Sequence, residues 1–244
     1  GLGNDSLFTD SGNNSLVGGG GNDTMAGGTG NDIYVVDADG DVVVEGSNAG
    51  TDLVQSSISY TLGANIENLT LTGSSAINGV GNGLNNLITG NSGSNSIDGD
   101  AGNDTIVGGG GNDSLLGGSG NDVFYVNQAD LASVVIQGGL GRDTVIITPG
   151  SENEDEDAVL ATVDLSKWTG IEKVQLQDGS DVSYTIFRSM VLSAKADLAT
   201  LSTATSSALS TTNSNVTALS TSASTGLSTT NSNVTALSTS ASTG

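Results

Sequence analysis

Apolar side chains recur at a nine-residue interval in two stretches of the chain. The residues at these positions are Leu7, Leu16, Met25 and Tyr34 in the first stretch and Ile88, Ile97, Ile106, Leu115 and Phe124 in the second. Six residues rich in glycine, asparagine and aspartate lead to each of them, and such residues favour tight turns. The three residues that follow each turn can form a minimal strand with one side chain facing inward. The pattern predicts a solenoid with two nine-residue units per coil.

A second pattern follows each stretch. Residues 31–36 resemble residues 121–126, and each segment leads to apolar–polar alternation, around Leu69 and Leu71 in one case and Val174 and Leu176 in the other. Such alternation predicts half-buried strands. We therefore expect an all-β parallel solenoid in two tandem copies. The predicted divisions are a β-roll at 1–40, wider coils at 41–76, a second β-roll at 77–130, a second solenoid cap at 131–183 with an acidic loop at 151–157, and a tail at 184–244.

Acidic and amide side chains follow the same nine-residue interval. They are Asp5, Asn14, Asp23 and Asp32, and then Asn86, Asn95, Asp104, Asp113 and Asp122. If eighteen residues make one coil, stacking pairs Asp5 with Asp23, Asn14 with Asp32, Asn86 with Asp104, Asn95 with Asp113, and Asp104 with Asp122. Carboxylates stacked about 4.8 Å apart repel one another unless a cation lies between them, and Ca²⁺ accepts six to eight oxygen ligands. The alternative interpretation is that these residues only form turns.

Composition narrows the chemistry further. The 244 residues contain no cysteine and no histidine, and 27 acidic against 5 basic side chains give a formal charge of −22. Thiol catalysis, disulfides, structural zinc and an imidazole base are excluded, and so acidic a chain does not bind nucleic acid. The glycine turns lack the following helix and lysine of a phosphate-binding loop. No apolar run is long enough to cross a membrane. Oxygen ligands and a hard cation remain.

The repeating unit is Gly-Gly-x-Gly-Asn-Asp-x-apolar-x, and two full copies stand in a row at 108–113 and 117–122. This unit resembles the RTX calcium-binding repeat, which folds as a β-roll. The resemblance implies several bound Ca²⁺ ions, held by the aspartate side chains and by the carbonyl groups of glycine turns. The implied turn glycines are Gly3, Gly12, Gly21, Gly30, Gly102, Gly111 and Gly120. Asn14, Asn86 and Asn95 depart from the family's aspartate, since an amide supplies an oxygen ligand without charge.

The tail from about residue 184 has a different composition. Residues 209–226 repeat without change as residues 227–244, and Leu209, Val216, Leu219 and Ala223 fall on one helical stripe. Serine and threonine form helices poorly, so this helix needs a partner, and we expect a helical coiled-coil stalk. The tail resembles the stalks of trimeric autotransporter adhesins. Disorder, or further solenoid, are the alternatives.

These patterns indicate a structural role. We expect a segment of an extracellular calcium-binding fibre or bacterial cell-surface adhesin, a solenoid stiffened by Ca²⁺ on an oligomeric stalk. Self-association as a trimer or filament and an unidentified surface ligand are the expected partners. The alternative is the calcium-folding secretion module of an exported RTX protease or lipase. The acidic residues occupy repeating positions rather than one cleft, so we expect no enzyme activity and read Trp168 and the tyrosines as packing residues.

Overall fold

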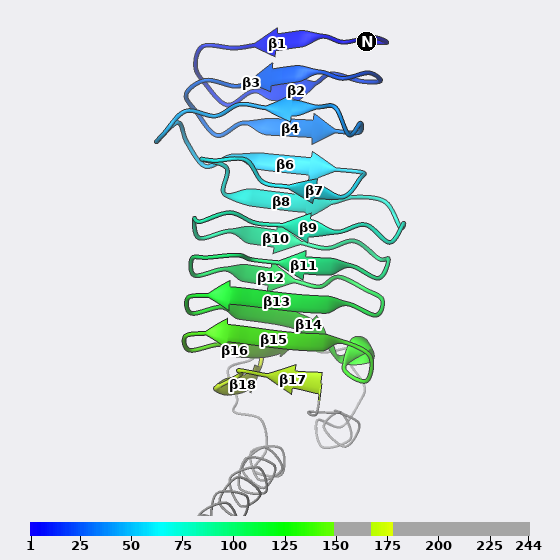
Figure 1. Ribbon diagram of the computed structural model, residues 1–244, viewed down its shortest axis with the longest axis vertical. Helices are drawn as coiled ribbons and strands as arrows, with labels where there is room; N and C mark the ends of the chain where they lie inside the picture. The colour runs from blue at the N-terminus through cyan, green and yellow to red at the C-terminus, as the bar shows by residue number, and fades with distance from the viewer. Residues whose placement is uncertain (149–166, 178–244) are drawn as a thin grey trace, which may run out of the picture. The chain divides into compact units, whose positions relative to one another are not determined.

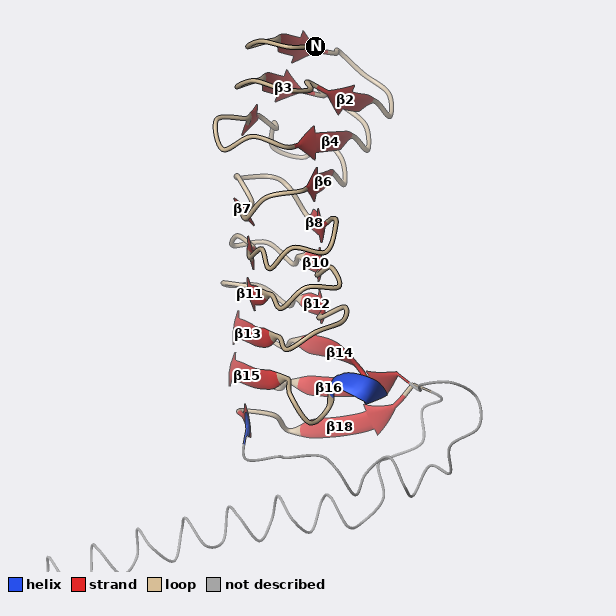
Figure 2. Cartoon of the chain, turned by 90° about the vertical axis from the view of Figure 1, so that its right-hand side faces the viewer, coloured by secondary structure: helices blue, strands red, loops and turns tan. Residues whose placement is uncertain are grey.

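The computed structural model describes residues 1–148 and 167–177, and these form a stack of parallel strands. Figure 1 shows the strands lying one above another, and Figure 2 shows even-numbered strands along one side of the stack and odd-numbered strands along the other. Except between β5 and β7, each strand pairs with the next strand on its own side, and these pairings are parallel. The predicted all-β parallel solenoid is confirmed for this part of the chain.

The even-numbered strands form one nine-stranded sheet. In chain order its strands are β2 (Ser15–Val17), β4 (Ile33–Val36), β6 (Leu53–Ser56), β8 (Asn68–Leu71), β10 (Leu87–Thr89), β12 (Thr105–Val107), β14 (Val123–Asn127), β16 (Thr144–Thr148) and β18 (Lys173–Leu176). Since β8 pairs with both β6 and β10, the sheet runs without a break from the first repeat block to the second. The two predicted copies are therefore successive parts of one solenoid.

The odd-numbered strands form two sheets. One contains β1 (Ser6–Phe8), β3 (Thr24–Ala26) and β5 (Val42–Val43), and the other contains β7 (Tyr60–Thr61), β9 (Gly79–Val80), β11 (Ser96–Asp98), β13 (Ser114–Ser119), β15 (Val135–Leu140) and β17 (Trp168–Thr169). The interruption lies between β5 and β7. A 3-10 turn, η1 (Gln128–Asp130), leads out of β14.

Strand register shows where the coils are regular. In the repeat blocks partners are eighteen residues apart, as for Leu16 with Tyr34 and Ile88 with Ile106. Outside them, strand partners are 20 residues apart from β4 to β6, as for Ile33 with Leu53, and 15 residues apart from β6 to β8, as for Leu53 with Asn68. The coils between the blocks are thus unequal in length. The coil from β4 to β6 is longer than a regular eighteen-residue coil, and the coil from β6 to β8 is shorter.

The core is a column of single side chains between the sheets. Met25, Tyr34, Ile88, Ile106 and Phe124 have no exposed surface. Leu16, Ile97 and Leu115 are also buried, as predicted. Leu7 is the exception, because it lies in the first coil and one of its faces is left without a covering coil. Trp168 is 6% exposed, which agrees with a packing role.

Several predictions concern residues outside the described part. The acidic loop at 151–157 and the predicted coiled coil at 184–244 belong to this group. Within the described residues, no helix has the length and apolar character needed to span a membrane.

Candidate metal centre

Each repeat turn connects to its neighbours through an adjacent asparagine and aspartate. The amide oxygen of Asn103 accepts a hydrogen bond from the N–H of Asn121 in the following coil, at 2.7 Å. The carboxylate of Asp122 accepts one from the N–H of Asp104 in the preceding coil, at 2.9 Å. The asparagine side chain thus accepts a hydrogen bond from the following coil, a forward bond, and the aspartate side chain accepts one from the preceding coil, a backward bond. This gives a physical reason for the Asn-Asp pair in the repeat.

The backward bonds form a column along the turns that lead into the nine-stranded sheet, and at the step from Glu67 to Asn86 the Asn86 Nδ2 donates to Glu67 O instead. Each member of this long column directly precedes one strand of that sheet: Asn14, Asp32, Asp52, Glu67, Asn86, Asp104, Asp122, Asp143 and Glu172. In most steps the side chain accepts the N–H of the preceding member, at 2.7 to 2.9 Å. The predicted pairs Asn14–Asp32, Asn86–Asp104 and Asp104–Asp122 are therefore neighbours.

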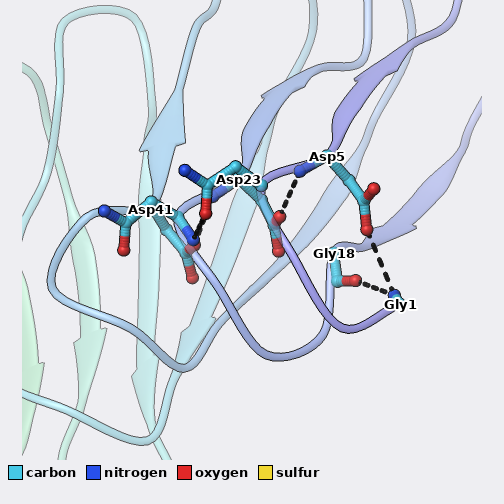
Figure 3. Close-up of polar contacts among 7 residues, drawn as sticks. Gly1, Asp5, Gly18, Asp23 and Asp41 are labelled. Atoms are coloured by element: carbon cyan, nitrogen blue, oxygen red, sulfur yellow. Dashed lines mark hydrogen bonds and ion pairs between the residues drawn. The ribbon is translucent and has the colours of Figure 1, made fainter.

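A shorter column lies before β1, β3 and β5. The N–H of Asp5 donates to Asp23 Oδ1 at 2.7 Å, and the N–H of Asp23 donates to Asp41 Oδ1 at 2.9 Å (Figure 3). The predicted pair Asp5–Asp23 is thus adjacent, although Asp5 is exposed and its Oδ2 lies 3.4 Å from the amino terminus. On the same side of the solenoid, before β11 and β13, the N–H of Asn95 donates to Asp113 Oδ1 at 2.9 Å, as that pairing predicted.

The second oxygen of these carboxylates distinguishes the columns from ordinary turns. Among the described residues, six buried carboxylate oxygens have no hydrogen-bond partner: Oδ2 of Asp23, Asp32, Asp52, Asp104, Asp122 and Asp143. These side chains are at most 1% exposed. A buried charged oxygen without a partner costs several kcal/mol, roughly, unless a cation or a proton neutralises it. Turn formation alone uses Oδ1 and leaves Oδ2 unexplained.

The pKa values of the buried aspartates also indicate that their negative charge is not compensated. Burial raises the pKa of Asp104 to about 7, and the charge of Asp122 adds to the effect. Burial likewise raises the pKa of Asp113 and of Asp52 to about 6, and it raises the pKa of Asp122 and Asp143. Hydrogen bonds from backbone N–H groups oppose these shifts only in part. The columns favour a bound positive charge, whether a proton or a metal ion.

The first glycine of each turn makes room for the free oxygen. A Cβ on Gly18, Gly27, Gly99 or Gly117 would collide with Oδ2 of the aspartate five residues later. The glycines named from the sequence serve a different purpose. All seven have positive φ, between 93° and 138°: Gly3, Gly12, Gly21, Gly30, Gly102, Gly111 and Gly120. They provide the left-handed turn, and a role of their carbonyl groups as ligands stays a prediction.

Two of the three asparagines in the ladders have complete hydrogen bonding without an ion. Asn86 Nδ2 donates to the carbonyl oxygens of Ile66 and Glu67, and its Oδ1 accepts from Asn82 N–H at 2.8 Å. Asn95 Nδ2 donates to Ile77 O at 2.6 Å, and its Oδ1 accepts from Asn91 N–H at 3.0 Å. In Asn14 the amide nitrogen donates to Gly12 O. The amides at Asn86 and Asn95 thus close their turns by themselves.

Sequence periodicity missed five column members. They are Asp41, Asp52, Glu67, Asp143 and Glu172. Asp41 keeps the eighteen-residue spacing but lacks the glycine turn, whereas the spacings to the other four are 20, 15, 21 and 29 residues. A usable signal was present, since each of these residues stands immediately before a strand-like segment, as Glu67 does before Asn68–Leu71.

The donor set fits a hard cation such as Ca²⁺. The columns offer only oxygen atoms, and the six partnerless carboxylate oxygens are buried beside glycine turns that leave them space. The fold and this site define a parallel β-solenoid with internal carboxylate columns.

Comparison with known families agrees with this class. Residues 1–34, 80–115 and 101–130 match the model of the RTX calcium-binding nonapeptide repeat (4 copies). The chain therefore carries RTX repeats in both of its periodic stretches. A comparison with curated proteins gave no match.

Proposed function

We propose that this chain is part of an extracellular structural protein whose solenoid folds and stiffens when it binds Ca²⁺. The observation that carries the proposal is the set of six buried, partnerless carboxylate oxygens in the columns. Asp32, Asp52, Asp104, Asp122 and Asp143 would hold ions along the long column, and Asp23 would do so on the opposite side. Bound Ca²⁺ would supply positive charge between stacked carboxylates that form no ion pair with a side-chain cation among the described residues.

The chain's own residues supply the rest of the switch. Backbone N–H groups fix each Oδ1, so that Oδ2 is oriented before an ion arrives. The first 141 residues contain no lysine or arginine. Without an ion, the carboxylates can reduce their repulsion only by taking up protons or by separating the coils. Low calcium would keep the chain open for export, and millimolar external calcium would close the stack.

Circular dichroism of the full chain tests this proposal. We expect little β-structure in a chelator and a cooperative gain on adding Ca²⁺, accompanied by a change in the fluorescence of Trp168, the only tryptophan and a buried residue. The double variant Asp104→Asn, Asp122→Asn should need more Ca²⁺ for the same transition. Asp39→Asn, which changes an exposed carboxylate, is the matched control. A spectrum that does not depend on calcium would contradict the proposal.

Within this structural class we propose a fibre or cell-surface adhesin that contributes no catalytic group of its own. The support is the repeating placement of its acidic side chains and the uncharged sequence repeat of the tail. Self-association through the tail, as a trimer or filament, belongs to this proposal. Sedimentation of the full chain tests it, and a monomer at all accessible concentrations would contradict it.

The secretion module of an exported RTX enzyme is the second candidate. The match to RTX repeats supports it as well as the first, since calcium-driven folding serves both roles. The complete reading frame distinguishes them: a catalytic domain upstream of these residues supports the secretion module, and a surface anchor supports the adhesin.

A further inference from the structure

A separate cluster of carboxylates lies where the odd-numbered side of the solenoid is interrupted. The three-stranded sheet ends with β5 and the next sheet starts with β7, while β4 and β6 remain paired on the other side. Residues 44–52 connect β5 to β6 across this interruption. We call Asp32, Glu45 and Asp52 the junction cluster. Asp32 comes from a repeat turn, whereas Glu45 and Asp52 lie outside the repeats.

The geometry of the junction cluster is compact and buried. One carboxylate oxygen from each residue lies within 4.8 Å of the other two. The exposed fractions of Asp32, Glu45 and Asp52 are 1%, 9% and 0%. Three formal negative charges are thus gathered away from solvent, and the first basic side chain in the sequence is Arg142. No ion pair with a side-chain cation balances them in the described residues.

The hydrogen bonds around the cluster leave two oxygens free. Asp32 Oδ1 accepts from Asn14 N–H, and Asp52 Oδ1 accepts from Asp32 N–H. The Oδ2 atoms of Asp32 and Asp52 are buried without any partner. These two atoms indicate a binding site for a ligand, because buried polar atoms nearly always have a hydrogen-bond partner.

Tyr34 orients the third carboxylate. Its hydroxyl donates to Glu45 Oε1 and accepts from the N–H of Gly27 at 2.7 Å. Glu45 Oε2 accepts from the N–H of Gly46. A Cβ on Gly27 would collide with both Asp32 Oδ2 and the Tyr34 hydroxyl, so this glycine leaves space beside the cluster.

We propose that Asp32, Glu45 and Asp52 together bind one Ca²⁺ ion, and that Glu45, which belongs to neither column, adds a third carboxylate to the Asp32–Asp52 step. Three side-chain carboxylates give this site more ligand charge than a repeat turn, and ligand charge raises calcium affinity. The ion would join the segment after β5 to the turns before β4 and β6, next to the break in pairing between β5 and β7. The inference rests on the proposed function in that Asp32 and Asp52 are both shared with the long column.

Terbium luminescence of the full chain tests the junction cluster. Tb³⁺ occupies hard oxygen sites and emits when an adjacent tyrosine is excited, and Tyr34 contacts Glu45 directly. We expect sensitised emission with the first equivalent of Tb³⁺, displaced by excess Ca²⁺. Tyr34→Phe should remove most of this emission while Tb³⁺ still binds. Tyr125→Phe, which changes a tyrosine on another coil, should retain it.

Calorimetric titration with Ca²⁺ provides the second measurement. Glu45→Gln should lower the number of bound ions by one or weaken the tightest site on the order of tenfold, with Asp39→Asn as the control that leaves both unchanged. Circular dichroism with saturating Ca²⁺ shows whether the variant still folds. If it does not, Glu45→Asp, which keeps the charge but shortens the side chain, is the second variant.

The outcomes separate this inference from the proposed function. Unchanged stoichiometry and affinity in Glu45→Gln, with emission retained in Tyr34→Phe, would overturn the junction site and leave the calcium columns intact. If the unaltered chain binds neither Ca²⁺ nor Tb³⁺, both proposals fail.

Discussion

At the scale of single residues, the two oxygens of one aspartate have different tasks. Oδ1 holds the preceding coil through a backbone N–H, and Oδ2 remains free beside the first glycine of the turn. The aspartate is therefore structural and ligand-like at once. A change at that glycine should affect the ion site without altering any carboxylate.

Gly99→Ala tests this arrangement. A Cβ at Gly99 would lie 2.6 Å from Gly117 O and would also collide with Asp104 Oδ2. We expect a loss of about 1–3 kcal/mol in the free energy of unfolding and weaker calcium binding, measured by urea denaturation at several Ca²⁺ concentrations. Gly83→Ala is the matched control, since nothing lies within 4 Å of its Cβ position. Equal effects of the two substitutions would refute the steric argument.

A second residue-scale prediction concerns the apolar column. Ile106 is fully buried and aligned with Ile88 and Phe124 in the neighbouring strands. Ile106→Ala should cost about 2–5 kcal/mol because it leaves a cavity between stacked side chains. Leu87→Ala, at a position 43% exposed, should cost much less. Urea denaturation in saturating Ca²⁺ measures both, and similar losses would argue against the column as the main core.

At the scale of elements, the turns are of two kinds. The turns before β12, β14 and β16 carry aspartates with a free oxygen, whereas those before β10 and β11 are closed by asparagine amides. The turns closed by asparagine complete their hydrogen bonds without an ion. They therefore interrupt the series of turns with a free carboxylate oxygen where the second repeat block begins.

Asn86→Asp should destabilise the fold even though it restores the repeat motif. The substitution removes the two amide donations to the carbonyl oxygens of Ile66 and Glu67 and adds a buried charge near Asp104. We expect a loss on the order of 1–3 kcal/mol in saturating Ca²⁺, where the chain is folded, read from urea unfolding. Asn103→Asp adds the same charge at an exposed position where only the side-chain oxygen is used, and it should cost less. Greater stability of Asn86→Asp than of the unaltered chain would contradict the distinction between the two kinds of turn.

At the scale of the whole molecule, the columns link folding to pH. Asp104 has a pKa of about 7 in the folded chain, mainly through burial, against an ordinary value near 4 when unfolded. Between these values the folded protein holds a proton that the unfolded chain has lost, so stability is greatest below about pH 4 and falls as the pH rises towards 7. Asp52 and Asp113, with pKa values of about 6, act in the same direction.

In chelator, the full chain should therefore be more stable at pH 5 than at pH 8. Adding Ca²⁺ at pH 8 should restore stability, because the ion takes the place of the protons. The folded fraction, read from circular dichroism at both pH values with and without Ca²⁺, provides the measurement. A metal-free chain that is more stable at pH 8 would contradict the folded-state pKa values.

The repeat blocks were predictable from sequence for a simple reason. Where every coil has eighteen residues, equal spacing along the chain becomes vertical stacking, so the core residues and pairs such as Asp104–Asp122 follow from counting. The lack of cysteine and histidine then left oxygen chemistry for a metal. These conclusions need no knowledge of how distant segments meet.

Tertiary structure decided what happens where the coils change length. Glu67, Asp143 and Glu172 join the long column at spacings that no period predicts, because strand register, rather than residue count, sets the height of each turn. Only the structure shows that the amides of Asn86 and Asn95 bond to the preceding coil. It also brings Glu45 beside Asp32 and Asp52, since the path of an irregular connection depends on what it packs against.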